Sequence, residues 1–156
     1  MAPSTVAPST TSTTVVPAPV SGLVGAWYLD ENGGSVGLDS SGNANHAALV
    51  AGPTWTAGHT GSATLFTGAA NQHLRVPNSS SINSISGQLS VSAWVKATAP
   101  TTNFFQGIVT RQLGVNSADQ WFLNLVGGKP TFAVNTVSGG AVSVANTAII
   151  PTNTWV

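Results

Sequence analysis

The segment 88–96, QLSVSAWVK, places the strongest constraint on the fold because its side chains alternate strictly in character. The odd positions carry aliphatic residues, namely Leu89, Val91, Ala93 and Val95. The even positions carry Ser90, Ser92, Trp94 and Lys96. A period of two over this length is typical of a β-strand with one face buried and one face solvated. The segment therefore predicts a strand in a sheet that covers an apolar core.

Short segments of the same kind recur on both sides of it. The strands expected before it are 23–29, 47–50, 63–67 and 73–76, with a loop over 52–61, and those after it are 104–111, 120–126, 129–137 and 141–147. Gly127-Gly128 joins two of these segments, and a two-residue Gly-Gly link favours a type I′ or II′ hairpin. A second turn is expected at residues 138–140, and one helical turn near residues 80–85. The pattern predicts an all-β fold, an antiparallel β-sandwich or jelly roll.

The first 21 residues differ in composition from the rest of the chain. They consist almost wholly of Ala, Pro, Ser, Thr and Val, with no charged or aromatic residue. Proline favours extended backbone, and such a segment buries too little apolar surface to order itself. We interpret residues 1–21 as a disordered Ser/Thr/Pro-rich linker to a neighbouring domain, and residues 22–156 as the folded domain.

Charge and cysteine content exclude several classes of function. Charged residues make up 5% of the chain and the formal net charge is zero, which argues against binding to nucleic acid. Cysteine is absent, so disulfides, thiolate metal sites and thiol nucleophiles are excluded. No apolar run is long enough to span a membrane, and no secretory signal follows Met1. The uncharged polar surface favours a secreted or cell-surface module whose signal lay upstream, or else Met1 is an engineered start.

Three motifs give the chain a resemblance to a known family. They are GLVGAWYLDENGG at residues 22–34, LDSSGNANHAAL at residues 38–49, and the alternating segment 88–96. Together they resemble the LamG-like jelly-roll domains of the concanavalin A-like lectin/glucanase superfamily. The resemblance covers essentially all of residues 22–156 and implies a concanavalin A-like jelly roll.

The resemblance also implies that further strands follow Val156, because residues 154–156 are similar to the start of a strand that continues in the family. We therefore expect a sandwich that lacks its last strands, with unpaired edges and bare apolar faces that leave it marginally stable.

In many relatives the loop that contains Asp39, Asn43 and Asn45 holds a structural Ca²⁺, so the resemblance implies calcium as a cofactor here. Calcium takes its ligands from carboxylate, amide and carbonyl oxygens of this kind. The alternative is that these side chains form Asx turns without a metal. A single carboxylate is a weak anchor for a divalent cation, and we favour the alternative.

Aromatic and amide side chains in loops are the candidate ligand-binding residues. Trp55 is the candidate platform for a sugar ring, and Asn71, Gln72 and His73 are candidate partners of sugar hydroxyls. The alternative is that the last three are ordinary solvated loop residues. We expect Trp94, like Trp27, Trp121 and Trp155, to be covered by a loop or by an opposing sheet.

The acidic residues do not predict an enzyme. Glycosidases need two opposed carboxylates, and this chain has only Asp30, Glu31, Asp39 and Asp119, without the Glu-x-Asp-x-x-Glu arrangement of glucanases on this fold. We expect a non-catalytic module that binds a glycan or an extracellular protein, covalently linked to other domains. The alternatives are a purely structural spacer of adhesin or phage-tail type and, less favoured, a fragment of a glucanase-like glycosidase.

Overall fold

The protein is described here by a computed structural model, which describes residues 22–101, 105–112, 119–135 and 140–156. The linker predicted over residues 1–21 and part of the turn predicted over residues 138–140 lie outside the described residues. The chain forms two compact units, Met1–Ser84 and Ile85–Val156. Among the described residues the secondary structure consists of antiparallel sheets and one short helix, so the predicted all-β class is confirmed, while the jelly-roll topology stays a prediction.

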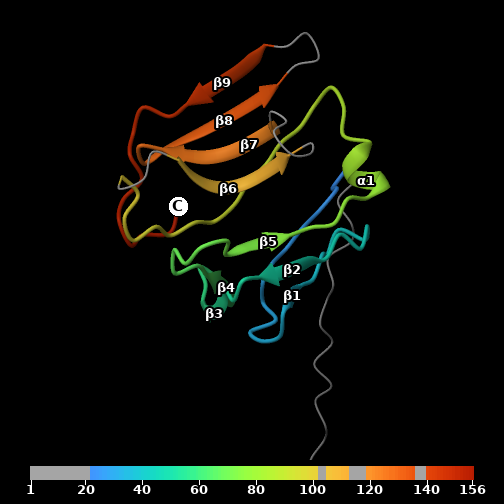
Figure 1. Cartoon of the computed structure of the whole chain (residues 1–156), viewed down its shortest axis with the longest axis vertical. Coiled ribbons are helices and arrows are strands. Elements are labelled where there is room, and N and C mark those ends of the chain that lie inside the picture. Colours follow the sequence, from blue (N-terminus) through green and yellow to red (C-terminus); the bar gives the residue numbers. More distant parts are fainter. Residues whose placement is uncertain (1–21, 102–104, 113–118, 136–139) are drawn as a thin grey trace, which may run out of the picture. The chain divides into compact units, whose positions relative to one another are not determined.

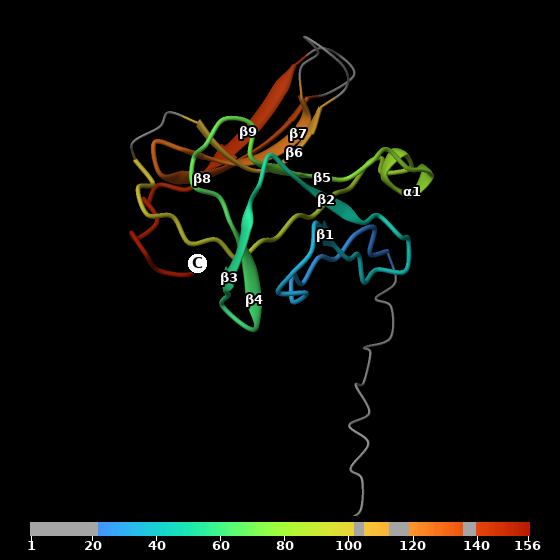
Figure 2. The same ribbon diagram turned by 60° about the horizontal axis from the view of Figure 1, so that its bottom comes forward.

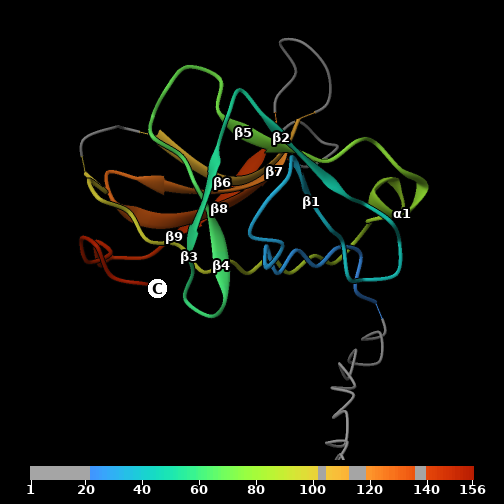
Figure 3. The ribbon, with the colours of Figure 1, turned by 90° about the horizontal axis from the view of Figure 1, so that it is seen from below.

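The N-terminal unit contains two small sheets (Figures 1 and 2). The first has the order β1-β2-β5, and the second is the hairpin of β3 and β4. Their bounds are β1 Val36–Gly37, β2 Ala47–Val50, β3 Thr54–Ala57, β4 Ser62–Leu65 and β5 His73–Arg75. β2 is the centre of the first sheet, with β1 alongside it (Figure 3), and its Ala47 is buried.

Helix α1, Ser80–Asn83, follows β5 in the same unit, in the region where one helical turn was predicted. Ser79 is its N-cap, and the Ser79 hydroxyl accepts a hydrogen bond from the backbone N–H of Ile82. Among the described residues, no helix is long and apolar enough to cross a membrane.

The C-terminal unit contains one sheet of four strands in the order β6-β7-β8-β9. The strands are β6 Phe105–Gln112, β7 Asp119–Val126, β8 Lys129–Asn135 and β9 Ala141–Ala145. Each pairs with the next along the chain, as the predicted meander requires. Gly127 and Gly128 join β7 to β8 with φ angles of 56° and 81°. Positive φ at both central residues is what a type I′ hairpin needs, so the Gly-Gly turn is confirmed.

Two predicted strands are wrong as strands. Residues 88–96 form no ladder: among the described residues their sheet-type pairing is confined to Val95, which exchanges two backbone hydrogen bonds with Val156. The burial follows the predicted alternation except at Ala93: Leu89, Val91 and Val95 are half-buried, whereas Ser90, Ser92, Trp94 and also Ala93 are exposed. Residues 23–29 form only an isolated bridge between Trp27 and Asp39. The other hydrogen-bond partners of their backbone groups are side chains. The periodicity of a sequence does not reveal that side chains take the place of a strand.

Two elements were not foreseen. The predicted loop over residues 52–61 contains β3, whose register pairs Trp55 with Thr64 of β4. The two-residue strand β1 lies in a stretch for which no element was predicted, and it pairs with β2. Both are too short for a period-two pattern to emerge, and β3 follows Gly52-Pro53, a pair that marks a turn.

Apolar burial is sparse in both units. Among the described residues the buried hydrophobic side chains are Ala47, Leu125, Ala133 and Ile150. In the described part of the chain no large side chain is completely buried, while Tyr28, Trp94, Val142 and Val144 are each more than 60% exposed. Burial of apolar surface is the main favourable term in folding, so the stability margin expected from this core is small.

The hairpin glycines provide a matched test of the tight packing in the C-terminal unit. A Cβ on Gly128 would lie 2.9 Å from Ile149 Cγ2 and 3.1 Å from Thr101 Cγ2, whereas a Cβ on Gly127 meets nothing within 4 Å. Gly127→Ala therefore measures left-handed strain alone, about 1–2 kcal/mol. We expect Gly128→Ala to lose about 1 kcal/mol more in urea unfolding, because its Cβ overpacks the site. Equal losses in the two variants would contradict this packing.

Candidate functional site

The side chain of Asp39 organises the first half of the N-terminal unit. Its Oδ1 accepts backbone N–H groups from Ala26 at 2.8 Å and Ser41 at 2.9 Å. Its Oδ2 accepts the Ser41 hydroxyl at 2.7 Å and the Asn45 N–H at 2.9 Å. The bond to the N–H two residues later is the signature of an Asx turn. The carboxylate thereby joins residues 26, 41 and 45, and Asp39 is only 9% exposed.

Burial raises the pKa of Asp39, but the hydrogen bonds from Ala26, Ser41 and Asn45 outweigh it, so the net shift is below the ordinary value of 3.8. Each of these donors stabilises the charged form of the carboxyl group. The carboxylate is therefore ionised at neutral pH, and the loop depends on that charge.

The backbone carbonyl of Val24 is a second centre of the same loop. It accepts the Ser41 hydroxyl at 3.2 Å, Asn43 Nδ2 at 3.2 Å and Asn45 Nδ2 at 2.8 Å. Asn45 Nδ2 also donates to Ser81 Oγ of α1 at 2.9 Å. The Asn45 carbonyl accepts Trp27 Nε1 at 2.7 Å. The loop side chains thus replace the strand partner that residues 23–29 lack.

The arrangement of Asp39, Asn43 and Asn45 does not fit a calcium site. An ionised carboxylate offers about four lone-pair positions, and the four donors to Asp39 occupy them. The two asparagines direct their Nδ2 groups, which are donors, at the Val24 carbonyl. The described residues also contain no cluster of three His, Cys, Asp or Glu side chains. A cation held by this carboxylate would have to displace the donors that shape the loop.

The structure places Asn71, Gln72 and His73 next to one another, and hydrogen bonds within the protein engage the side chains of Gln72 and His73. Gln72 Oε1 accepts from the N–H and the hydroxyl of Thr67, and Gln72 Nε2 donates to the carbonyl of Gly52 at 3.0 Å. His73 begins β5, and its Nδ1 lies 2.7 Å from the Asn71 carbonyl oxygen. The side chains of Gln72 and His73 thus hold the loop before β5 through bonds to Thr67, Gly52 and the Asn71 carbonyl.

Trp55 lies in β3 and not in a loop, which corrects the predicted location. It is half-buried, and its Nε1 donates to the carbonyl of Gly34 at 2.9 Å. None of the described hydrogen bonds joins it to residues 71–73. Ligand binding at Trp55, Asn71, Gln72 and His73 stays a prediction.

An open depression of about 480 Å³ lies elsewhere in the N-terminal unit. It is lined by Asp30, Asn32, Thr56, Ala57, Gly61 and Ser62. Asp30 Oδ1 already accepts the Ser62 N–H at 2.9 Å, and none of the predicted ligand residues lines the depression. The depression lies at the β3–β4 turn, and its described lining residues do not present a set of binding groups that point toward one position.

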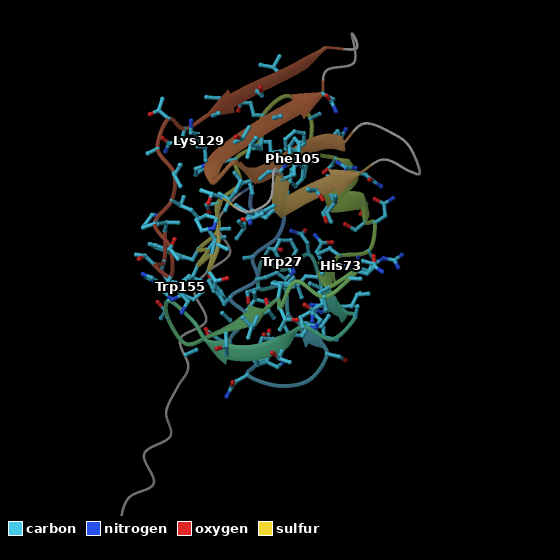
Figure 4. All side chains as sticks on the ribbon, turned by 60° about the vertical axis from the view of Figure 1, so that its left-hand side comes forward. Trp27, His73, Phe105, Lys129 and Trp155 are labelled. Carbon is cyan, nitrogen blue, oxygen red and sulfur yellow. The ribbon has the colours of Figure 1, made fainter. Side chains whose placement is uncertain are left out.

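The aromatic residues of the C-terminal unit form a more distinctive surface. Trp94 is 61% exposed, so the prediction that it is covered is wrong. Pairing of Val95 with Val156 places Lys96 opposite Trp155, and Lys96 Nζ lies 5.2 Å from the centre of the Trp155 ring (Figure 4 labels Trp155). Trp94 follows Ser92 and precedes Lys96 at the spacing of the exposed side of an extended chain. Trp27, Trp121 and Trp155 are half-buried.

The opposite side of the same segment faces an apolar hollow of about 340 Å³. Its lining includes Ala93, Val95, Leu123, Leu125 and Ile150. The segment therefore has an apolar side turned to the sheet and a side that presents Trp94, as the alternation predicted even though no strand forms.

Sequence reasoning missed Ser41 as a member of the Asp39 network, and it missed the exposure of Trp94. The signal for Ser41 was available, because an Asp followed two residues later by Ser is a common Asx-turn sequence. The exposure of Trp94 followed from its place among Ser90, Ser92 and Lys96, and a general expectation that tryptophan is covered overrode that local pattern.

The acidic side chains of the N-terminal unit serve as hydrogen-bond acceptors for turns. Glu31 Oε1 accepts the N–H of Leu38 at 2.7 Å, and Asp30 and Asp39 accept backbone N–H groups as described above. The side chain of Asp119 lies outside the described residues.

Comparison with known proteins returns no relatives. No family model, no curated protein and no solved structure matches this chain.

Asp39→Asn tests the loop network. The amide group of Asn would place its own N–H donors against N–H and O–H groups that now donate to the carboxylate. We therefore expect the free energy of unfolding to fall by about 1–3 kcal/mol at pH 7. Because the folded pKa lies below 3.8, the ionised carboxylate stabilises the protein above that pH and loses this effect as the pH falls through the folded pKa. The difference between wild type and variant in urea unfolding should therefore shrink below pH 3.8. The control is Asp30→Asn at an exposed position, which should lower the free energy of unfolding by less than Asp39→Asn does.

Calcium titration tests the fit at the same loop. A cation that binds the folded state raises the melting temperature by mass action. We expect the melting temperature of the wild-type chain to be unchanged between EDTA and about 5 mM CaCl₂, a concentration well above the dissociation constants of most protein calcium sites. A rise that Asp39→Asn abolishes would show that the loop rearranges to bind the ion.

Proposed function

We propose that this chain is a non-catalytic, carbohydrate-binding module of a larger secreted or cell-surface protein, with a LamG-like jelly-roll fold. The observation that carries the proposal is the 61% exposure of Trp94 on the polar side of its segment. A flat, exposed indole is a stacking surface for the apolar face of a sugar ring, and large exposed aromatics mark interaction sites.

The neighbours of Trp94 support a sugar more than an apolar peptide. Ser90 and Ser92 are exposed on the same side of the segment and offer hydroxyl donors and acceptors. Lys96, held over the Trp155 ring, adds an ammonium donor at the other end. A flat ring with hydroxyl and ammonium groups on either side of it suits a polyhydroxylated ligand.

The use of the acidic groups supports a binding role over catalysis. Asp30, Glu31 and Asp39 each accept backbone N–H groups that fix turns. A glycosidase instead needs a pair of carboxyl groups facing each other across a substrate. The described carboxylates contribute to the architecture of the N-terminal unit.

A structural spacer without a ligand is the second candidate. It is favoured by the loop of residues 71–73, where the side chains of Gln72 and His73 are engaged by neighbouring backbone. The two functions differ in one respect that can be measured, since a spacer binds no glycan.

A glycan array probed with the wild-type chain, Trp94→Ala and Trp94→Phe tests the proposal. We expect wild type to bind a subset of glycans, Trp94→Ala to weaken that binding by about tenfold or more, and Trp94→Phe to retain part of it through its flat ring. Trp55→Ala, checked for folding by circular dichroism, separates the originally predicted platform from this one. A blank array for wild type would favour the spacer, and unchanged binding by Trp94→Ala would place the site elsewhere.

A further inference from the structure

The strand β9, Ala141–Ala145, is the last strand of its sheet (Figure 1), and none of the described strands pairs with its outer edge. The backbone N–H of Asn146 donates to the carbonyl of Pro130, and the register continues through the pairs Val144–Phe132 and Val142–Val134. Hydrogen-bonded positions alternate along an antiparallel pair. Val142 and Val144 therefore direct their backbone groups to β8, and Ala141, Ser143 and Ala145 direct theirs away from the sheet.

The sequence of this strand, AVSVA, reads the same in both directions. When two copies pair antiparallel about Ser143, Ala141 lies opposite Ala145, Val142 opposite Val144, and Ser143 opposite itself. The outward backbone groups of each copy then meet their complements in the other copy. Such an isologous pairing is self-complementary in both hydrogen bonding and side-chain size.

The side chains of β9 favour the same pairing. Val142 and Val144 are 66% and 69% exposed and lie on one face, so the valines of two copies would form a single cluster on that face. They would occupy the non-hydrogen-bonded positions, where facing side chains approach most closely. Burial of these valines is a gain that the single chain lacks.

The edge carries none of the usual protection against such pairing. Natural edge strands are guarded by lysine, proline, bulges or inward charges. β9 has no charged residue and no proline, and its register with β8 is unbroken. The chain has a formal net charge of zero, so two copies approach without net repulsion.

From these observations we propose that β9 is a homodimerisation edge. Two copies of the chain pair antiparallel through Ala141–Ala145 about a two-fold axis at Ser143, and the four-stranded sheet continues across both. The contact is a short strand, well below the area of a standard interface, so the dimer is weak and depends on concentration.

Sedimentation equilibrium of the intact chain, from micromolar to about millimolar concentration, tests the proposal with two matched variants. Ser143→Lys places two lysines directly opposite each other on the axis, and like charges in that position are destabilising. We expect its dimer dissociation constant to rise by about fivefold or more, and the rise to be smaller at high salt. Thr152→Lys adds the same charge at an exposed turn residue outside β9 and should leave the constant unchanged.

A cysteine crosslink gives a second test that does not depend on weakening the protein. The chain has no cysteine, so Ser143→Cys introduces a single thiol. Hydrogen-bonded antiparallel partners have Cα atoms about 5.5 Å apart, within the range that a disulfide spans. Mild oxidation should yield disulfide dimers of Ser143→Cys much faster than of Thr152→Cys. A monomer at all concentrations, equal crosslinking of the two variants, or a dimer unaffected by Ser143→Lys would each overturn the proposal.

Discussion

The ionised carboxylate of Asp39 is the constraint on which the N-terminal unit depends. Residues 22–30 have only one bridge residue, Trp27, and no ladder of their own. Their backbone is held because Asp39 accepts from Ala26, and because three side chains of the following loop donate to Val24. A buried or half-buried backbone group without a partner costs free energy comparable to a lost hydrogen bond. The loop therefore acts as a strand partner made of side chains.

This polar solution suits a chain with little apolar burial. The buried hydrophobic side chains among the described residues are few, and two of the four are alanines. In such a unit the hydrogen bonds do not add large net stability, since each exchanges for bonds to water. They do specify one arrangement, because any alternative leaves Asp39 or the Val24 carbonyl without its partners. Geometry in the N-terminal unit is set more by satisfied polar groups than by packing.

Long strands could be predicted from the sequence, whereas short ones could not, because a period-two pattern needs several residues to show. The meander from β6 to β9 was predicted because its strands are long enough to show alternation and because the pair Gly127-Gly128 is typical of a tight hairpin turn. β1 and β3 were missed because two to four residues carry no period. Segment 88–96 shows the converse case: the alternation predicts the burial at every aliphatic position except the exposed Ala93, while the backbone pairing depends on a residue distant in sequence, Val156.

The candidate sites show a different limit. The sequence named Asp39, Asn43 and Asn45 as one group, and they do share a network, but it could not tell whether their oxygens accept hydrogen bonds or are free to hold an ion. Trp55 was selected because its neighbours were predicted to form a loop, and the structure corrects that location to β3, while its role in ligand binding stays a prediction. Asn71, Gln72 and His73 were predicted as candidate partners of sugar hydroxyls, and the structure shows that the Gln72 side chain donates to a backbone carbonyl distant in sequence, that of Gly52. Hydrogen-bond partners at such separations are set by the tertiary fold.

In an extended chain, successive residues point to opposite sides. This alternation determines both surfaces that we consider functional, the one around Trp94 and the outer edge of β9. Val95 points to the apolar hollow, and so Trp94 must point away from it; a shift of one residue would exchange the two. In β9 the same parity directs the backbone of Val142 and Val144 to β8 and leaves that of Ser143 outward. The pairing of Val95 with Val156, and of Asn146 with Pro130, fixes these parities. Two backbone contacts in the C-terminal unit thus determine which side chains and which edge face outward.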